Sequence, residues 1–231
     1  MTGVGGGTLS VPLLTLVTGQ PIWESVGTAL LFSSVVKIYA AWRYYLDRNI
    51  DFHVLRTLLL GGLPGVIAGS FLMQRWSGEH NKRTMIAAVG GIVAATSGVS
   101  LYRTFRTFQR TCSPAGVICV IACLIGIEIG FSSAGAGALG SVLLFNTTTL
   151  SAVSVVGTDL AFGLALSLVG GFIHLSTGNW HPQLLIPFVT GGLVGVFLGA
   201  RLSRRISPGR LRQVVLASAT ILGLALLKQG L

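Results

Sequence analysis

Two glycine clusters contain the residues of this chain that are best suited to bind a small ligand. One lies at residues 3–7 and the other at residues 130–137, and serine or threonine flanks each of them. Glycine lets the backbone turn, and the helix after such a turn presents N–H groups to an anion, with hydroxyls as extra donors. We therefore predict an anion-binding site here; the alternative is close packing of helices through small residues. The predicted binding residues are Gly5, Gly6, Gly7, Thr8, Ser10, Thr28, Ser132, Ser133, Gly135, Gly137 and Thr158.

Three ionisable residues lie within apolar segments, where a charge is costly. A carboxylate near the centre of a bilayer costs about 2.5–3.5 kcal/mol even on a mild scale, so Asp159 needs a reason to be there. It either belongs to a proton or substrate site, or lies in the first turn of its helix, stabilised by the helix dipole and Thr158. Glu128 precedes the second glycine cluster and either takes up protons or reaches the lipid headgroups. For Lys37 we favour snorkelling or a pair within the protein over binding of a substrate anion.

Serine and histidine also allow a different chemistry, that of an intramembrane serine hydrolase. Ser132 or Ser133 would be the nucleophile and His174 the base. No acidic residue is evidently placed to orient the histidine, and Thr2 corresponds to Ser132 in the repeat described below. We therefore expect that the protein is not an enzyme, and the hydrolase is the weakest alternative.

The composition is that of an integral membrane protein. Hydrophobic residues make up 52% of the 231 residues and charged residues only 10%, and the mean hydropathy is +0.78. Nine apolar segments are predicted to be helices, and two of them are too short to span a bilayer and suit half-membrane elements. The predicted helices are 8–18, 26–46, 56–74, 84–102, 114–131, 138–150, 154–175, 183–202 and 212–228, of which 8–18 and 138–150 are the short ones.

Other classes of ligand find no support in the composition. The net charge of +10 could suggest a nucleic-acid partner, but the basic residues lie in short loops between apolar segments and are better explained as topology signals. Cys112, Cys119 and Cys123 form no CxxC pair and have no clustered histidines beside them. We therefore expect no nucleic-acid partner, no metal and no other cofactor.

The chain contains an internal repeat with a constant offset of 130 residues. Gly27-Thr28-Ala29-Leu30 returns as Gly157-Thr158-Asp159-Leu160, and a Gly61–Gly69 stripe of glycines at every fourth position returns in residues 191–199. We predict one transmembrane domain of two repeats, residues 1–110 and 111–231, with tight helix packing along both stripes. By the offset, a partner for helix 114–130 would precede Met1, so the first repeat is expected to lack its N-terminal helix.

The loop charges favour an inverted arrangement of the two repeats. If each repeat crosses the membrane an odd number of times, eleven basic residues share one face and four the other, whereas an even number gives eight against seven. Inverted repeats are typical of secondary transporters, whose halves move about a site between them.

In order along the chain, several motifs resemble those of one family of bacterial membrane transporters, the sulfite exporter TauE/SafE family. They are the glycine cluster followed by Val11-Pro12-Leu13-Leu14, the Gly27-Thr28 pair, the Arg48-Asn49-Ile50-Asp51 turn, the Gly61–Gly69 stripe, Gly157-Thr158-Asp159 and Gly199-Ala200-Arg201-Leu202. The resemblance implies a multi-pass protein of the cell inner membrane that moves sulfite or organosulfonates, commonly outward.

We therefore predict a polytopic bundle of two inverted repeats that acts as a secondary carrier, an exporter of small anions. We expect Asp159 or Glu128 to couple transport to protons, because a carboxylate beside an anion site is tolerated mainly when it is protonated. A passive anion channel is the main alternative. The expected partners are the anion, the lipid bilayer and a coupling proton or other ion; whether the chain forms a homo-oligomer is left open.

Overall fold

The computed structural model describes residues 7–104, 114–134, 137, 139–202 and 208–231, and within these ranges the chain forms nine α-helices and one short 3-10 turn, Glu79–Asn81, with no strand. The helices are α1 (Gly7–Thr18), α2 (Ile22–Leu46), α3 (Phe52–Trp76), α4 (Lys82–Thr104), α5 (Ala115–Ser132), α6 (Leu139–Thr147), α7 (Ala152–Ser176), α8 (Pro182–Leu202) and α9 (Pro208–Gly230).

All of the predicted helices are present, and α2, α3 and α9 each begin four residues earlier than predicted. At α2 and α3 the reason is that local capping signals precede the apolar segments. Pro21, whose φ of −54° suits a helix entry, stands immediately before α2. At α3 the Asp51 carboxylate accepts a 2.9 Å hydrogen bond from the Val54 N–H. α1 and α6, with 12 and 9 residues, are the two short helices that the sequence predicts.

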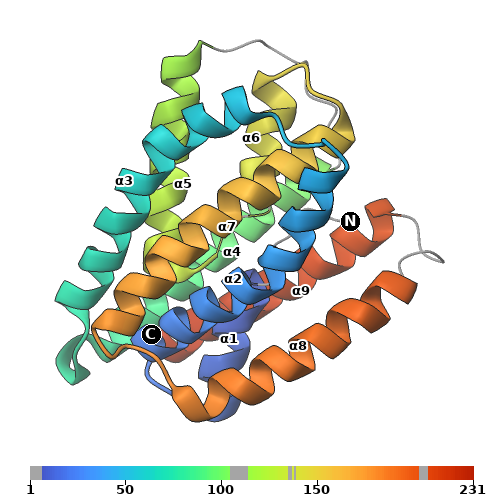
Figure 1. Ribbon diagram of the computed structural model, residues 1–231. Coiled ribbons are helices and arrows are strands. Elements are labelled where there is room, and N and C mark those ends of the chain that lie inside the picture. The colour runs from blue at the N-terminus through green and yellow to red at the C-terminus, as the bar shows by residue number, and fades with distance from the viewer. Residues whose placement is uncertain (1–6, 105–113, 135–136, 138, 203–207) are drawn as a thin grey trace.

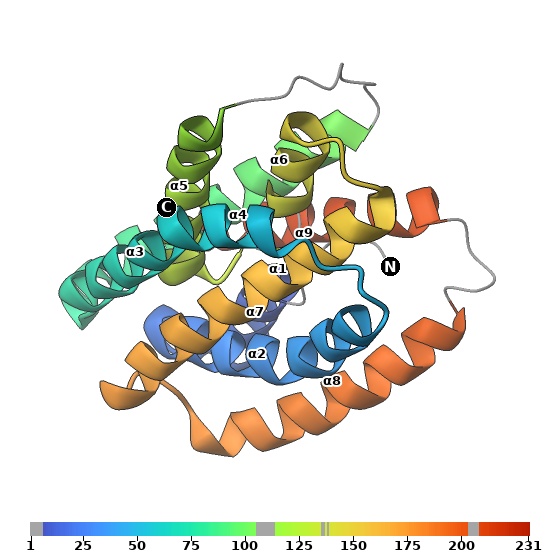
Figure 2. The same cartoon turned by 45° about the horizontal axis from the view of Figure 1, so that its top comes forward.

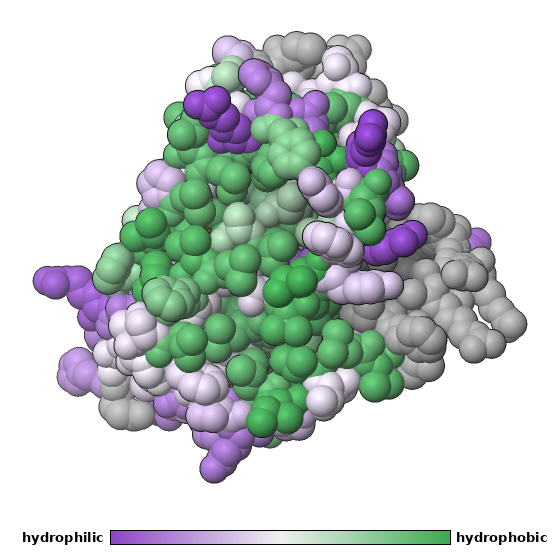
Figure 3. Space-filling model, in the orientation of Figure 1, coloured by the Kyte–Doolittle hydropathy of each residue, from purple (hydrophilic) through white to green (hydrophobic). Residues whose placement is uncertain are grey.

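Six helices of the described chain are long and apolar enough to cross a membrane, which confirms a polytopic helical membrane protein. They are α2, α3, α4, α5, α7 and α9. The described apolar part of α8, Pro182–Gly195, is shorter than a full span, although a seventh crossing was predicted there. Figure 3 shows apolar residues over the middle of one face, with hydrophilic residues at its upper edge and lower left corner.

α2 and α7 lie side by side through the middle of the molecule and run in opposite directions (Figure 1). Near the start of α2, a Cβ on Gly27 would overlap the Asn179 carbonyl that follows α7. Near the start of α7, a Cβ on Gly157 would overlap the Asn49 carbonyl that follows α2.

The other helices pack around this central pair: α3 packs on α5 and α4 packs on α9. α8 lies beside α2 at the lower edge of the second view (Figure 2), and the rings of Phe32 and Phe188 meet there edge to face.

Contacts between the two halves are reciprocal under the offset of 130 residues. The Thr28 hydroxyl accepts a 3.0 Å hydrogen bond from the His181 N–H, and the Thr158 hydroxyl accepts a 3.0 Å hydrogen bond from the Asp51 N–H. Replacing each residue of the first pair by its repeat equivalent yields the second pair. This is the contact pattern of a two-fold axis between the halves. The boundary between the repeats and their orientation in a membrane stay predictions.

The two glycine stripes differ, although the repeat predicts the same role for both. A Cβ on Gly61, Gly65 or Gly69 would overlap a carbonyl oxygen of α5, so close packing of this stripe is confirmed. At Gly191 and Gly195 in α8, a Cβ would meet nothing within 4 Å. The predicted packing is therefore wrong for these two, because no helix of the described chain lies against this side of α8 in the way that α5 lies against α3.

Candidate functional site

The first helix begins where the fifth helix ends, so the described parts of the two glycine clusters meet. α5 ends at Ser132, and Ser133 caps it in the left-handed conformation, with a φ of 57° and its N–H donating to the Ile129 carbonyl at 2.8 Å. A Cβ on Gly7 would overlap the Ser133 carbonyl oxygen and lie 3.0 Å from the Ser133 Oγ. Glycine at position 7 thus allows the start of α1 to approach the cap of α5.

This junction contains a buried hydroxyl with unused hydrogen-bonding capacity. Ser133 is 3% exposed, and its Oγ has no hydrogen-bond partner among the described residues. Thr8 and Ser10, in the first turn of α1, are also buried. The first N–H groups of a helix have no partner within that helix and carry a partial positive charge. The start of α1 and the Ser133 hydroxyl together could therefore solvate a small anion.

The other short helix, α6, has the carboxylate of Asp159 at its first turn. The side chain of Asp159 is buried, and its Oδ2 lies 2.6 Å from the Ser141 Oγ, which is also 2.8 Å from the Gly137 carbonyl oxygen. A Cβ on Gly140 would overlap the Asp159 Oδ1. The positive end of α6 therefore faces an anion that the chain itself supplies.

This geometry corrects one of the two interpretations of Asp159. The sequence allowed Asp159 to lie in the first turn of its own helix, but α7 begins at Ala152, two turns earlier, where the Ser151 side chain accepts a hydrogen bond from the Ser154 N–H. Thr158 does not support that interpretation either, since its hydroxyl accepts from the Asp51 N–H. The helix terminus that stabilises Asp159 belongs to α6.

A small polar cluster lies where α2 crosses α7, and we call Ser33, Lys37, Gly163 and Ser167 the axis quartet. The Lys37 Nζ donates to the Ser167 Oγ at 3.1 Å and to the Gly163 carbonyl at 3.3 Å, and the Oγ atoms of Ser167 and Ser33 are 3.5 Å apart. Ser167 is the repeat equivalent of Lys37, and Gly163 that of Ser33. Residues that contact their own equivalents lie on the two-fold axis.

Lys37 is buried within the protein, so its ammonium group does not snorkel to the surface and instead donates hydrogen bonds to other residues of the chain. Its side chain is 6% exposed, and the negative charge of Asp159 attracts it. A buried charge is tolerated when an opposite charge and hydrogen bonds compensate it. A single lysine within an apolar segment was the sequence signal for this residue; its partners, more than a hundred residues away, gave no signal.

Several predicted binding residues already make structural hydrogen bonds. The Thr28 and Thr158 hydroxyls accept from backbone N–H groups in the loops after α7 and α2. The Ser132 hydroxyl donates to the Glu128 carbonyl at 2.9 Å and accepts from the Ala134 N–H at 3.2 Å. A role of these three residues in binding stays a prediction.

The remaining predicted residues divide into those the structure describes and those it does not. The Oε1 atom of Glu128 is buried without a hydrogen-bond partner among the described residues. No hydrogen bond within the described ranges joins Glu128 to Asp159. Gly137 is buried and accepts from Ser141. Gly5, Gly6 and Gly135 lie outside the described residues.

The hydrolase alternative gains no support from the position of His174. Its Nε2 lies 3.5 Å from the Gly130 carbonyl oxygen. Within the part of the chain that the structure describes, no hydrogen bond joins His174 to Ser132 or Ser133. A histidine base must reach the hydroxyl that it activates, and this arrangement does not show such a contact.

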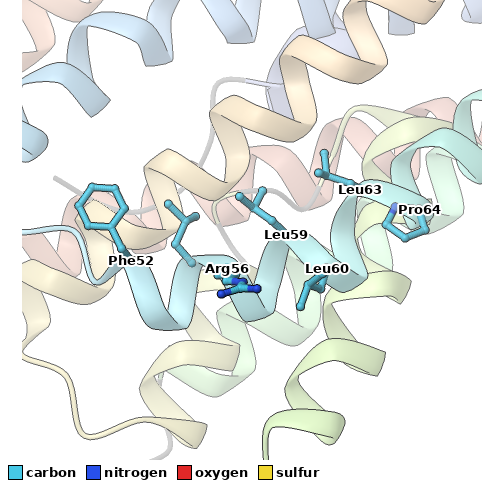
Figure 4. A pocket seen from close by; sticks show the side chains of 7 residues that line it. Phe52, Arg56, Leu59, Leu60, Leu63 and Pro64 are labelled. Carbon is cyan, nitrogen blue, oxygen red and sulfur yellow. The ribbon is translucent and has the colours of Figure 1, made fainter.

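A hollow of about 450 Å³ lies along α3, away from these groups (Figure 4). Phe52, Arg56, Pro64 and four leucines line it, and none of them is a predicted site residue. Its lining is apolar apart from Arg56, which suits neither a small hydrated anion nor a proton site. We therefore place the candidate site at the α1–α5 junction, the first turn of α6 and the axis quartet.

Comparison with known proteins gives a consistent result over the whole chain. The family model described as sulfite exporter TauE/SafE matches residues 1–226. The chain is 27% identical to the probable membrane transporter protein YjnA of Bacillus subtilis (strain 168), over 98% of this chain and 93% of that protein. It is 24% identical to the probable membrane transporter protein YdhB of the same organism, over 97% and 93% of the two chains. No solved structure matches it. The chain therefore belongs to the sulfite exporter TauE/SafE family of membrane transporters.

Proposed function

We propose that this protein is a secondary carrier that exports small sulfur oxyanions, sulfite or organosulfonates, across the cell inner membrane. The description of the family supports the class of substrate and the direction, and the names of the relatives support transport across a membrane. Two antiparallel central helices with reciprocal contacts suit halves that move against each other about a site between them.

The observation that carries the proposal is the meeting of the α1 N-terminus with the buried Ser133 hydroxyl. A sulfite or sulfonate group has several oxygen atoms, each of which accepts hydrogen bonds. The first N–H groups of α1 and the Ser133 O–H are hydrogen-bond donors, and Ser133 lacks another partner in the described chain. The anion would bind at this junction, which we call the junction site.

The two short helices then have different roles. The start of α6 faces Asp159, whereas the repeat equivalent of Asp159 is Ala29, which carries no charge. The α1 side is thus left for the substrate, and Asp159 is the carboxylate that we propose for proton coupling. Glu128, with one carboxylate oxygen lacking a partner among the described residues, is the second candidate.

The test is transport by purified protein in liposomes. Radiolabelled sulfite and a small sulfonate are offered with and without an imposed pH gradient, and saturable, gradient-dependent uptake is expected. Conductance that does not saturate would instead support a passive channel, and labelling of Ser132 by a serine-reactive phosphonate would support a hydrolase.

A pair of serine variants links transport to the junction site. Ser133→Ala removes a donor from the proposed site and is expected to raise KM for sulfite about tenfold or more, since a hydrogen bond to a charged ligand contributes about 1.5–3 kcal/mol. The matched control is Ser176→Ala, at an exposed position near the end of α7. Equal KM values for the two variants would remove Ser133 from the site.

A further inference from the structure

We infer that Lys37 forms a second position for the transported anion on the two-fold axis, where the anion takes over from Asp159 as the negative charge that compensates the lysine. The inference rests on the proposed function and adds a residue that the predicted site does not contain. Its basis is the geometry of the axis quartet and of the Asp159 carboxylate.

The position of Lys37 is special because it touches its own repeat equivalent. When two halves move against each other, residues on the axis that relates them stay between the two ends of the pathway. Lys37 contacts Ser167, and the contact of Lys37 with Gly163 has its reciprocal in the contact of Ser167 with Ser33. The repeat equivalents of the four residues are therefore the same four residues, and Lys37 is the charged one. In halves that move in this way, a cation at this point would meet an anion that enters from either end.

The surroundings of Asp159 match the needs of a small oxyanion. Its carboxylate faces the first turn of α6, contacts the Ser141 hydroxyl and is attracted by Lys37. N–H groups at a helix start, a hydroxyl and an ammonium group are the donors that bind sulfite or a sulfonate equally well. Asp159 therefore occupies a place whose chemistry is that of the transported anion.

One cation cannot compensate two anions in a buried site, so the two compete. When Asp159 takes up a proton, it loses its charge, and Lys37 then needs another anion. Binding of the anion and protonation of Asp159 favour each other by linkage, and this couples the two without direct contact between proton and substrate.

Few other titratable groups lie close enough to interfere. From α2, Lys37 and Tyr44 face α7, with Tyr44 packed at Gly157, and Asp51 at the start of α3 contacts Thr158 through its backbone. Among the described residues α6 has no titratable side chain, and no hydrogen bond joins Glu128 of α5 to Lys37 or Asp159. The exchange thus concerns the pair of Lys37 and Asp159.

The experiment compares charge variants in the liposome assay. Lys37→Gln is expected to lower kcat/KM for sulfite at least about tenfold, as for loss of the charged partner of a buried anion. Lys37→Arg should keep measurable transport, because it keeps the charge. The control is Lys228→Gln, at an exposed lysine in the last turn of α9. Size-exclusion profiles and thermal unfolding show whether each variant folds.

The double variant Lys37→Gln/Asp159→Asn separates a binding lysine from a structural one. It removes both charges and so avoids an unpaired buried carboxylate. If Lys37 only compensates Asp159, the double variant recovers transport, and this result overturns the inference. If Lys37 binds the anion, the double variant stays at the level of Lys37→Gln, while Asp159→Asn alone still transports sulfite.

The same assay distinguishes failure of the inference from failure of the proposed function. Uptake of neither sulfite nor sulfonate by the unaltered protein would overturn the proposed function, and the inference with it. Uptake by the unaltered protein together with unchanged kinetics of Lys37→Gln would overturn the inference alone.

Discussion

At the scale of single residues, the sequence identified the costly charges, and the structure supplied their partners. Asp159 and Lys37 are conspicuous because charges are rare within apolar segments. The residues that stabilise them come from other helices: Ser141 and the first turn of α6 for Asp159, and Ser167 and Gly163 for Lys37. Composition and periodicity do not report such contacts, because they depend on how distant segments pack.

The neutral variant Asp159→Asn is expected to transport sulfite with little dependence on an imposed pH gradient. The amide resembles the protonated carboxyl in shape and charge, so it leaves Lys37 available to the anion but has no proton to exchange. Initial uptake rates with and without the gradient give the measurement. Full gradient dependence in Asp159→Asn would shift the coupling role to Glu128, for which Glu128→Gln is the matched variant.

A substitution at Gly140 should disturb the contact between the Asp159 carboxylate and the first turn of α6. The added methyl group of Gly140→Ala would overlap the Asp159 carboxylate, so we expect a loss of about 1–3 kcal/mol in the free energy of unfolding. Gly116→Ala is the control, since a Cβ there would meet nothing within 4 Å. Unfolding of both variants in detergent checks the prediction, and equal stability would show that Asp159 can move away from α6 without cost.

At the scale of the elements, hydrophobic length predicted every helix, whereas capping determined where some of them begin. Pro21 and Asp51 start α2 and α3 ahead of the apolar segments. The repeat correctly indicated glycine packing in α3, but it could not show that the matching stripe in α8 has no helix against it. Sequence identity between two repeats predicts similar local structure, but it does not predict which helices pack against each repeat.

The repeat pair Gly65 and Gly195 offers a direct test of this difference between α3 and α8. Gly65→Ala would overlap the Cys123 carbonyl of α5 and should destabilise the protein by about 1–3 kcal/mol. Gly195→Ala should leave stability unchanged or raise it by up to about 1 kcal/mol, since alanine favours a helix and nothing obstructs it. Thermal unfolding under identical conditions is the measurement. A loss of stability in Gly195→Ala similar to that in Gly65→Ala would mean that this side of α8 is in contact with another element.

The two threonines that hold the loops should behave alike because their contacts are reciprocal. Thr28→Val and Thr158→Val each leave a backbone N–H without its acceptor and should each cost about 1–3 kcal/mol of unfolding free energy. Thr190→Val, at an exposed threonine bonded within its own turn of α8, is the control and should have little effect. Markedly unequal losses of unfolding free energy for Thr28→Val and Thr158→Val would show that the two hydrogen bonds do not contribute equally to stability.

At the scale of the whole molecule, the offset of 130 residues explains more of the structure than any single motif. It accounts for the reciprocal hydrogen bonds, for the antiparallel central helices and for a lysine that contacts its own repeat equivalent. A sequence repeat predicts similar halves, and loop charges predicted that they are inverted; the reciprocal contacts are what such halves make when they pack about a two-fold axis. The orientation of this axis relative to a bilayer is measured in the membrane-embedded protein.

Cysteine labelling at Asp47 and Thr177 tests the orientation of the two repeats in the membrane, because these residues are repeat equivalents at the exposed ends of the two central helices. Each caps its helix, α2 or α7, and each is exposed, so a cysteine at either position can react without disturbing a buried contact. In a variant whose native cysteines are replaced, Asp47→Cys and Thr177→Cys are treated with a membrane-impermeant maleimide in intact spheroplasts. Inverted repeats require that the two positions lie on opposite sides, and the positive-inside rule puts residue 47 in the cytoplasm and residue 177 outside. We therefore expect rapid labelling at 177 and labelling at 47 only after the membrane is permeabilised. Labelling of both from the same side would show that the halves are not inverted in the membrane and would contradict the antiparallel arrangement of α2 and α7.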